Sequence, residues 1–353
     1  MTNYTDMNTL LKLGQIDPEL KELLDANPLP VLDYSSLRDF SELYAKNSER
    51  AKGLLGPSPP GVKVTELQYP TRDGFHNRAK LLQPTEFPEK GSPLIVMIHG
   101  GGFCFGSPEG EEQTCRNFVL ALGATCVAVA YRLAPDYRFP HALNDCWDAL
   151  KWCAENAVSW SADTTVGFIV GGSSAGANIA AILAHLARDE GLAPPLTGQY
   201  LAIPLLLPDD SMPEKYRSLW VARQQNADAP ILPKAALDMF MRAYKADTTD
   251  TVNFAVFNHP RGHRHLPPVY LQVDGMDPLR DDGIIYERVL REASGVETKM
   301  DVYPGLPHGH WSFFPMLAAS TQARKDQLAG MGWLLGRMPE ISRVSFGPVA
   351  ATV

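Results

Sequence analysis

The chain has 353 residues, of which 45% are hydrophobic and 20% are charged, and this composition is typical of a globular protein with a large core rather than a disordered one. Its 32 basic and 40 acidic residues give a formal net charge of −8, and a negative chain repels phosphate backbones, which argues against nucleic acid as a partner. No stretch of the sequence is long and apolar enough to predict a membrane span.

The first sixty residues are predicted to contain two helices. One begins at Asp17-Pro18 and ends before Pro28, and the other begins at the capping pattern Ser36-x-x-Asp39. The opening residues lack the basic and apolar runs of a secretory signal. We interpret residues 1–60 as the first segment of a helical cap, ended by the Gly- and Pro-rich linker 53–61.

Strand-like and helical patterns alternate through the rest of the chain. Buried-type strands that alternate with helices predict a mostly parallel sheet with helices on both faces, which is an α/β architecture of eight strands. A helical, charged stretch at 205–265 has no clear strand, so it is predicted to be a cap insertion between two core parts, 61–204 and 266–353. The predicted strands are 62–69, 78–84, 93–99, 125–131, 166–172, 198–204, 267–275 and 298–305, and the predicted helices are 142–157, 175–189, 282–295 and 323–338.

The five cysteines lie between Cys104 and Cys153. Their number is odd, their spacing matches no zinc pattern, and several fall in buried-type segments, so we interpret them as reduced core thiols rather than disulfides or metal ligands. This predicts a cytoplasmic protein with no metal. No interface is readable in the sequence, so monomer and homodimer both stay open.

The segment Gly172-Ser173-Ser174-Ala175-Gly176 follows a predicted strand and precedes a predicted helix. In this context the G-x-S-x-G pattern predicts a nucleophile elbow, because the two glycines allow a sharp turn that exposes the central serine at the positive end of a helix dipole. Ser174 is the predicted nucleophile. The alternative is a Gly/Ser-rich turn with no chemical role.

A glycine run, His99-Gly100-Gly101-Gly102, follows another predicted strand. Glycines let backbone N–H groups approach a reacting atom without a side chain in the way, so the run predicts an oxyanion hole. We assign its donors to the N–H groups of Gly101, Gly102 and Ala175. His99 is expected to fix the loop through hydrogen bonds rather than act as a base.

A serine nucleophile needs a base and an acid that orients it, and in this type of fold the chain order is Ser, then Asp or Glu, then His. Asp277 follows a predicted strand and is the preferred acid, although Asp274, Asp281 and Asp282 flank it.

The base is expected in the turn-rich loop after the last strand, which holds two histidines, His308 and His310. Either imidazole has a suitable pKa, so chemistry alone leaves both open.

Aromatic residues near these motifs are candidates for lining a substrate pocket, although core packing is an equal alternative. The candidates are Phe103, Trp311 and Phe313. A further cluster, His259, His263 and His265, is interleaved with arginines that oppose a cation, so it is expected to be a solvated loop and not a metal site.

Six motifs in order, HGGGF, YRLAP, FPHALNDCWDALKW, GSSAGAN, DPLRDDG and PHGHWSF, resemble the hormone-sensitive-lipase-like branch of the α/β-hydrolases, in particular its fungal members. That branch includes carboxylesterases and arylacetamide deacetylase-like proteins. The resemblance runs from about Val62 to the last helix, and it implies an α/β-hydrolase fold with a cap.

The resemblance assigns the nucleophile to Ser174, the acid to Asp277 and the base to His308, because the family histidine is followed by glycine. The chain departs from the family at two positions. Ser173 stands where many members have Asp, and His310 stands where an aromatic residue is common. We expect both departures to affect substrate fit or pH optimum without removing a member of the triad.

The leading hypothesis is a serine carboxylesterase that hydrolyses small to medium acyl esters through an acyl-enzyme, without a cofactor. The alternative is a natural-product tailoring enzyme that uses the same triad for deacetylation, acyl transfer, lactone chemistry, elimination or cyclisation. A third hypothesis is a small-molecule receptor like the gibberellin receptors, which resemble this fold but have lost the triad histidine. The presence of His308 argues against the receptor.

Overall fold

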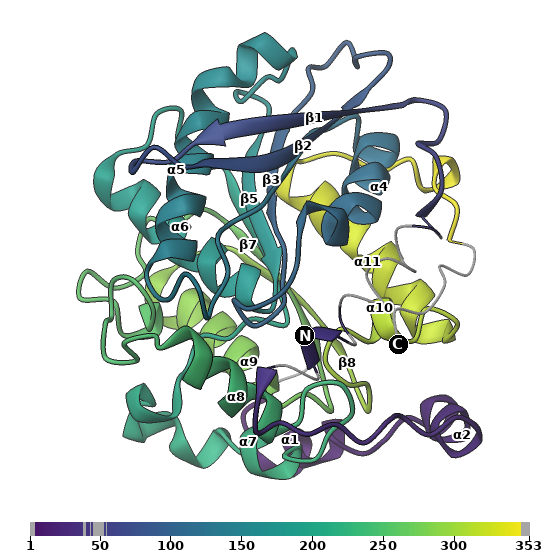
Figure 1. The fold of residues 1–353 in the computed structure, drawn as a ribbon, viewed down its shortest axis with the longest axis vertical. Coiled ribbons are helices and arrows are strands. Elements are labelled where there is room, and N and C mark those ends of the chain that lie inside the picture. Colours follow the sequence, from purple (N-terminus) through teal and green to yellow (C-terminus); the bar gives the residue numbers. More distant parts are fainter. Residues whose placement is uncertain (1–3, 38–39, 43, 45–52, 54, 347–353) are drawn as a thin grey trace.

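The computed structural model describes residues 4–37, 40–42, 44, 53 and 55–346, and its eight strands form one sheet in the order β1-β2-β4-β3-β5-β6-β7-β8 (Figure 1). β2 pairs antiparallel with both β1 and β4, and every other pair is parallel. The prediction of a mostly parallel, eight-stranded α/β-hydrolase sheet is therefore confirmed. The strands are β1 (Val62–Pro70), β2 (His76–Pro84), β3 (Leu94–Ile98), β4 (Thr125–Val129), β5 (Phe168–Ser173), β6 (Gly198–Ala202), β7 (Val269–Asp274) and β8 (Thr298–Tyr303).

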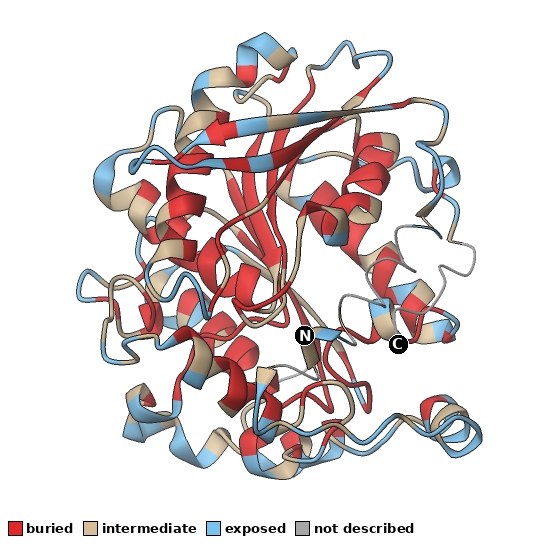
Figure 2. Ribbon diagram, viewed as in Figure 1, coloured by how far each residue is buried: buried red, intermediate tan, exposed pale blue. Residues whose placement is uncertain are grey.

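Helices cover both faces of the sheet. α5 (His141–Asn156) and α6 (Ala175–Glu190) lie on one face, and α4 (Glu112–Leu122) and α11 (Ala318–Leu334) lie on the other (Figure 1). Every residue of β3, β4, β6 and β7 is buried, as expected for parallel strands between two helical layers (Figure 2).

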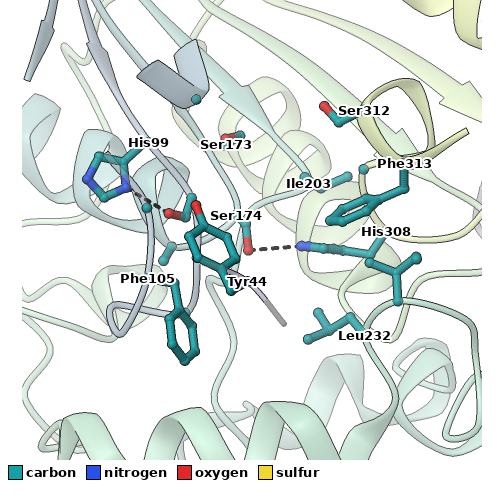
Figure 3. Close-up of a pocket in the computed structure, with 18 of the residues that line it drawn as sticks. Tyr44, His99, Phe105, Ser173, Ser174, Ile203, Leu232, His308, Ser312 and Phe313 are labelled. Carbon is teal, nitrogen blue, oxygen red and sulfur yellow. Dashed lines mark hydrogen bonds between the residues drawn. The ribbon is translucent and has the colours of Figure 1, made fainter. Parts of the chain in front are cut away.

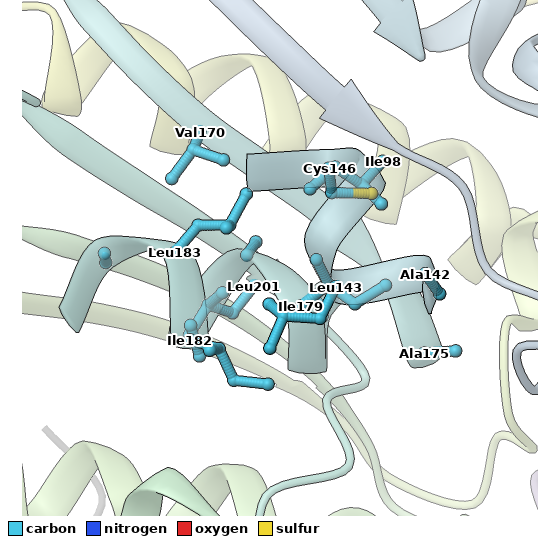
Figure 4. Close-up of a cluster of buried hydrophobic side chains, with 14 of the residues drawn as sticks. Ile98, Ala142, Leu143, Cys146, Val170, Ala175, Ile179, Ile182, Leu183 and Leu201 are labelled. Carbon is cyan, nitrogen blue, oxygen red and sulfur yellow. The ribbon is translucent and has the colours of Figure 1, made fainter. Parts of the chain in front are cut away.

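The core beneath α6 fixes the start of that helix against the sheet. Ile179 and Leu183 of α6 pack with Val170 of β5 and Leu201 of β6 (Figure 4). Full burial of each such side chain stabilises the fold by roughly 1.5–3 kcal/mol. The end of β5 and the beginning of α6, where the predicted nucleophile lies, are therefore held by a rigid scaffold.

The N-terminal segment differs in part from the prediction. The helix expected after Asp17 is present as α2 (Pro18–Ala26), and the Asp17 side chain caps it. An additional helix, α1 (Met7–Leu13), was not predicted, because seven residues with only two buried leucines give too short a periodic pattern. The helix predicted to begin at Ser36–Asp39 falls largely outside the described residues.

The connection between β6 and β7 contains the region interpreted as the cap insertion. All of residues 205–265 are described, and no strand lies among them. The boundaries at 205 and 265 stay a prediction. The helices of this region are α7 (Ala222–Gln225), α8 (Lys234–Tyr244) and the 3-10 segments Asp209–Ser211, Glu214–Leu219 and Val256–Asn258.

The remaining helices also differ from the sequence patterns at their ends. α4 was not predicted, and α9 (Arg280–Arg288) continues directly into a π-helical turn at Val289–Ala293. None of the described helices has the combination of length and apolar residues that a membrane span needs. The other short helices are Pro108–Glu111, Ala157–Trp160, α10 (His310–Phe313) and Ile341–Arg343.

Candidate active site

Ser174 lies between β5 and α6 in a strained backbone conformation, with φ 53° and ψ −116°. Such a conformation is costly for a residue with a side chain and is found where a site requires it. The turn needs glycine on both sides, because a Cβ at Gly172 would lie 2.5 Å from the Gly176 carbonyl carbon, and a Cβ at Gly176 would lie 2.1 Å from the Ile98 oxygen. This is the geometry expected of a nucleophile elbow.

The structure brings Ser174, His308 and Asp277 into one hydrogen-bonded line. His308 Nε2 lies 2.9 Å from Ser174 Oγ (Figure 3). On the other side of the ring, His308 Nδ1 lies 2.6 Å from Asp277 Oδ2. Asp277 is fully buried, and its other oxygen accepts a hydrogen bond from the Leu279 N–H at 2.8 Å. This arrangement can transfer a proton away from the serine hydroxyl.

The second histidine of the loop, His310, faces a different aspartate. His310 Nδ1 lies 2.8 Å from Asp274 Oδ1, and both residues are fully buried. Burial raises the pKa of Asp274, while the neighbouring His310 acts in the opposite direction. His310 does not border the pocket, so its departure from the family pattern has no direct contact through which to change substrate fit.

The glycine loop after β3 has the conformation that open backbone donors require. Gly101 and Gly102 have φ values of 114° and 59°. A Cβ at Gly101 would lie 2.3 Å from the Phe105 oxygen, and a Cβ at Gly102 would lie 2.5 Å from the Phe240 ring. Neither N–H donates to an acceptor among the described residues. Ala175 is the first residue of α6, where backbone N–H groups have no intrahelical partner. All three assigned donors are therefore free for an oxyanion.

His99 is buried beside this loop, where it has a structural role as expected. Its Nδ1 lies 2.8 Å from the Gly100 oxygen, and its ring stacks on Tyr131 with centroids 4.2 Å apart. Burial lowers the pKa of His99 to about 4, so the imidazole is neutral near pH 7.

A cavity of about 430 Å³ opens over Ser174 and His308. The three predicted pocket residues, Phe103, Trp311 and Phe313, all border it. Phe103 is 1% exposed and its ring stacks on Tyr244 at 4.1 Å, so its main contact is packing. The connection between β6 and β7 contributes apolar residues to the lining, among them Leu232, Leu237 and Phe240.

A buried carboxyl group borders the same cavity and was not singled out by the sequence. Glu111 is 7% exposed, and Ser173 Oγ donates a 2.8 Å hydrogen bond to its Oε1. Burial raises the pKa of Glu111 to about 7. Three glutamates lie close together at 109–112, and nothing in the sequence indicates which of them faces the site.

The raised pKa of Glu111 predicts a pH-dependent loss of stability. Between pH 4.5, the ordinary pKa, and pH 7 the folded protein keeps a proton that the unfolded chain releases, so stability falls as pH rises through this window. Glu111→Gln removes the titration and is expected to gain up to about 3 kcal/mol relative to wild type between about pH 4 and pH 8.

Urea unfolding of both proteins across this pH range measures the difference. Glu297→Gln is the matched control, because Glu297 is exposed, and it is expected to follow wild type. Parallel stability curves for wild type and Glu111→Gln would contradict the prediction.

The expectation of a solvated loop for the histidine cluster is wrong for two of its members. His259 and His263 are buried, and only His265 is exposed. His263 Nδ1 lies 3.0 Å from Nε2 of His185 on α6, a contact between segments that sequence spacing does not reveal.

Within the described part of the chain, no group of His, Cys, Asp or Glu is arranged to hold a metal ion. All five cysteines are unpaired and buried, as predicted.

The fold and the site together define a hydrolase that acts on ester bonds. Residues 95–312 match the sequence model of the family described as the alpha/beta hydrolase fold, and the chain belongs to this family. The predicted placement in its hormone-sensitive-lipase-like branch is confirmed.

Two curated relatives and one solved structure show the similarity over nearly the whole chain. Esterase LipI of Mycobacterium tuberculosis is 35% identical over 92% of this chain and 97% of its own. Versiconal hemiacetal acetate esterase of Dothistroma septosporum is 32% identical over 87% of this chain and 92% of its own. The crystal structure of vibralactone cyclase superposes with a TM-score of 0.83 at 31% identity, covering 92% of this chain and 96% of that one.

Proposed function

We propose that this protein is a serine carboxylesterase in which Ser174 is the nucleophile, His308 the base and Asp277 the orienting acid. The observation that carries the proposal is the line of contacts from Ser174 Oγ through His308 to Asp277 at the floor of the cavity. The substrates are small to medium acyl esters, and the chemistry needs no cofactor.

In the first half of the reaction, Ser174 Oγ attacks the acyl carbon while His308 Nε2 accepts its proton. The N–H groups of Gly101, Gly102 and Ala175 stabilise the negative oxygen, and each such donor contributes roughly 2.7–4 kcal/mol to transition-state stabilisation. His308 then gives the proton to the leaving alkoxide, which departs as an alcohol.

In the second half, water attacks the acyl-enzyme and gives its proton to His308. The carboxylic acid leaves, and the proton returns to Ser174. Asp277 accepts the Nδ1–H hydrogen bond throughout, which fixes the imidazole tautomer and stabilises the imidazolium.

The esterase names of two relatives support this proposal. The likeness to vibralactone cyclase supports a second candidate, a tailoring enzyme that uses the same triad for acyl transfer, lactone chemistry or a non-hydrolytic step. A cytoplasmic location stays a prediction, supported by the five unpaired, buried cysteines. The oligomeric state stays open.

Turnover and active-site labelling together test the proposal. We expect the protein to hydrolyse p-nitrophenyl esters of short and medium acyl chains and to react with a fluorophosphonate, and peptide mapping is expected to locate the label on Ser174. Label without turnover on any ester would favour the tailoring enzyme. If the protein is not labelled and turns over no ester, both the esterase and the tailoring enzyme are refuted.

A further inference from the structure

Glu111 differs from Glu109 and Glu112 in having no cationic partner among the residues that the structure describes. Glu109 pairs with Arg78 at 2.6 Å, and Glu112 pairs with Arg116 at 2.7 Å. No ion pair forms at Glu111 among the described residues. Glu109 and Glu111 both border the cavity, but only Glu109 has its charge compensated there.

The only side chain with a hydrogen bond to Glu111 in the described structure is Ser173. A carboxyl group has two oxygens and about four lone pairs, so a single bond from a hydroxyl group leaves most of its hydrogen-bonding capacity unused. A buried polar group with unused capacity is costly unless a ligand or water satisfies it. Burial also raises the pKa of Glu111 to about 7, so the group is able both to donate and to accept a hydrogen bond near neutral pH.

The position of the Glu111 carboxyl group relative to Ser174 limits which part of a bound substrate it contacts. Ser173 immediately precedes Ser174, and in Figure 3 it lies on the opposite side of Ser174 from Phe105 and Leu232. Phe105 and Leu232 therefore make one side of the cavity apolar, and Ser173 and Glu111 bring polar groups to its other side. Other polar side chains that border the cavity from α4, β6 and α11 are Asn117, Tyr200, Arg324 and Gln327.

We propose that Glu111 and Ser173 form a specificity-determining subsite that binds a hydroxyl group on the substrate, so that the preferred esters carry a hydroxyl on the chain that enters this side of the cavity. The inference rests on the proposed esterase function. A hydroxyl group both donates and accepts, which matches a carboxyl group whose one side-chain hydrogen bond among the described residues comes from Ser173.

A purely structural role for Glu111 makes a different prediction. A residue that only holds Ser173 and the elbow would change the hydrolysis of all esters by a similar factor. A residue that binds the substrate changes the ratio between an ester with a hydroxyl group and its methyl analogue, because the analogue leaves the buried carboxyl group without a partner. The ratio of two kcat/KM values for one enzyme preparation is independent of the fraction that folds correctly.

The test uses two pairs of esters of matched size, one for each side of the ester bond. The acyl pair is the p-nitrophenyl esters of ω-hydroxyhexanoate and heptanoate, and the alcohol pair is ω-hydroxybutyl acetate and pentyl acetate. In wild type we expect the hydroxyl member of one pair to have the higher kcat/KM. Glu111→Leu is expected to lower that hydroxyl-to-methyl ratio by about 10-fold or more.

Two further variants separate hydrogen bonding from charge and position. Glu111→Gln keeps a donor and an acceptor and is expected to retain most of the hydroxyl preference. Glu112→Gln removes an ion-paired neighbour that does not border the cavity and is expected to leave the ratio unchanged. Equal ratios in wild type and Glu111→Leu for both pairs would overturn the subsite. Failure of the esterase function itself is distinguishable, because then no ester of either pair turns over.

Discussion

Ser174→Ala is expected to lower kcat for p-nitrophenyl ester hydrolysis by about 10⁴- to 10⁶-fold. Alanine keeps the elbow backbone but has no oxygen to form the acyl-enzyme, so the residual rate comes from the oxyanion hole and substrate binding alone. The measurements are steady-state turnover and the loss of fluorophosphonate label, with circular dichroism to show that the fold is retained.

The experiment also tests whether the neighbouring hydroxyl group, that of Ser173, replaces Ser174 as the nucleophile. Ser173 precedes Ser174 in the chain, but its Oγ donates to Glu111 and forms no hydrogen bond with His308 in the described structure. Label that persists in Ser174→Ala, or turnover within tenfold of wild type, would show that another group is the nucleophile.

His308→Ala and His310→Ala are expected to differ in acylation rather than in stability. His308→Ala removes the base that contacts Ser174 Oγ, so acylation is expected to fall by about 10⁴- to 10⁶-fold. It also leaves Asp277 fully buried without its side-chain partner. His310→Ala leaves Asp274 fully buried without its side-chain partner, and breaking such a buried pair destabilises a protein by about 3–5 kcal/mol.

The acylation rate per folded molecule distinguishes the two variants, and thermal unfolding gives the folded fraction of each. The folded fraction of His310→Ala is expected to keep most of its acylation rate, measured as fluorophosphonate labelling below its melting temperature. If His310→Ala loses acylation while His308→Ala keeps it, the base is His310 and the triad assignment is wrong.

The sheet was predictable because each strand carries its own local signal. β3 and β4 are runs of buried apolar residues, and β5 ends in the glycines of the elbow. α1 and α4 were not predicted because their local apolar signal is weak. α1 has only two buried residues, and the buried residues of α4 include Glu112, Arg116 and Asn117, so its core-facing side does not read as apolar.

The part of the candidate site that lies in local sequence motifs was predictable. The order Ser174, Asp277, His308 follows from the segments after three strands, because parallel strands bring their carboxyl ends to one edge of a sheet. The histidines at 259 and 263 show the limit of this reasoning. Their partner is His185 of α6, which lies 78 residues from His263, and no local pattern links them.

The sequence alone determined the α/β-hydrolase fold, the elbow at Ser174 and the glycine loop, because each depends on local backbone conformation and short-range patterning. The chemistry of the two residues left His308 and His310 open, and only the family resemblance favoured His308. The tertiary structure supplies the physical reason, because His308 lies within hydrogen-bond distance of Asp277 and Ser174, whereas His310 lies within hydrogen-bond distance of Asp274. It also decided which of the three glutamates at 109–112 lacks an ion pair. Glu109 and Glu112 pair with cations on other segments, whereas Glu111 has no ion pair among the described residues and accepts a hydrogen bond from Ser173.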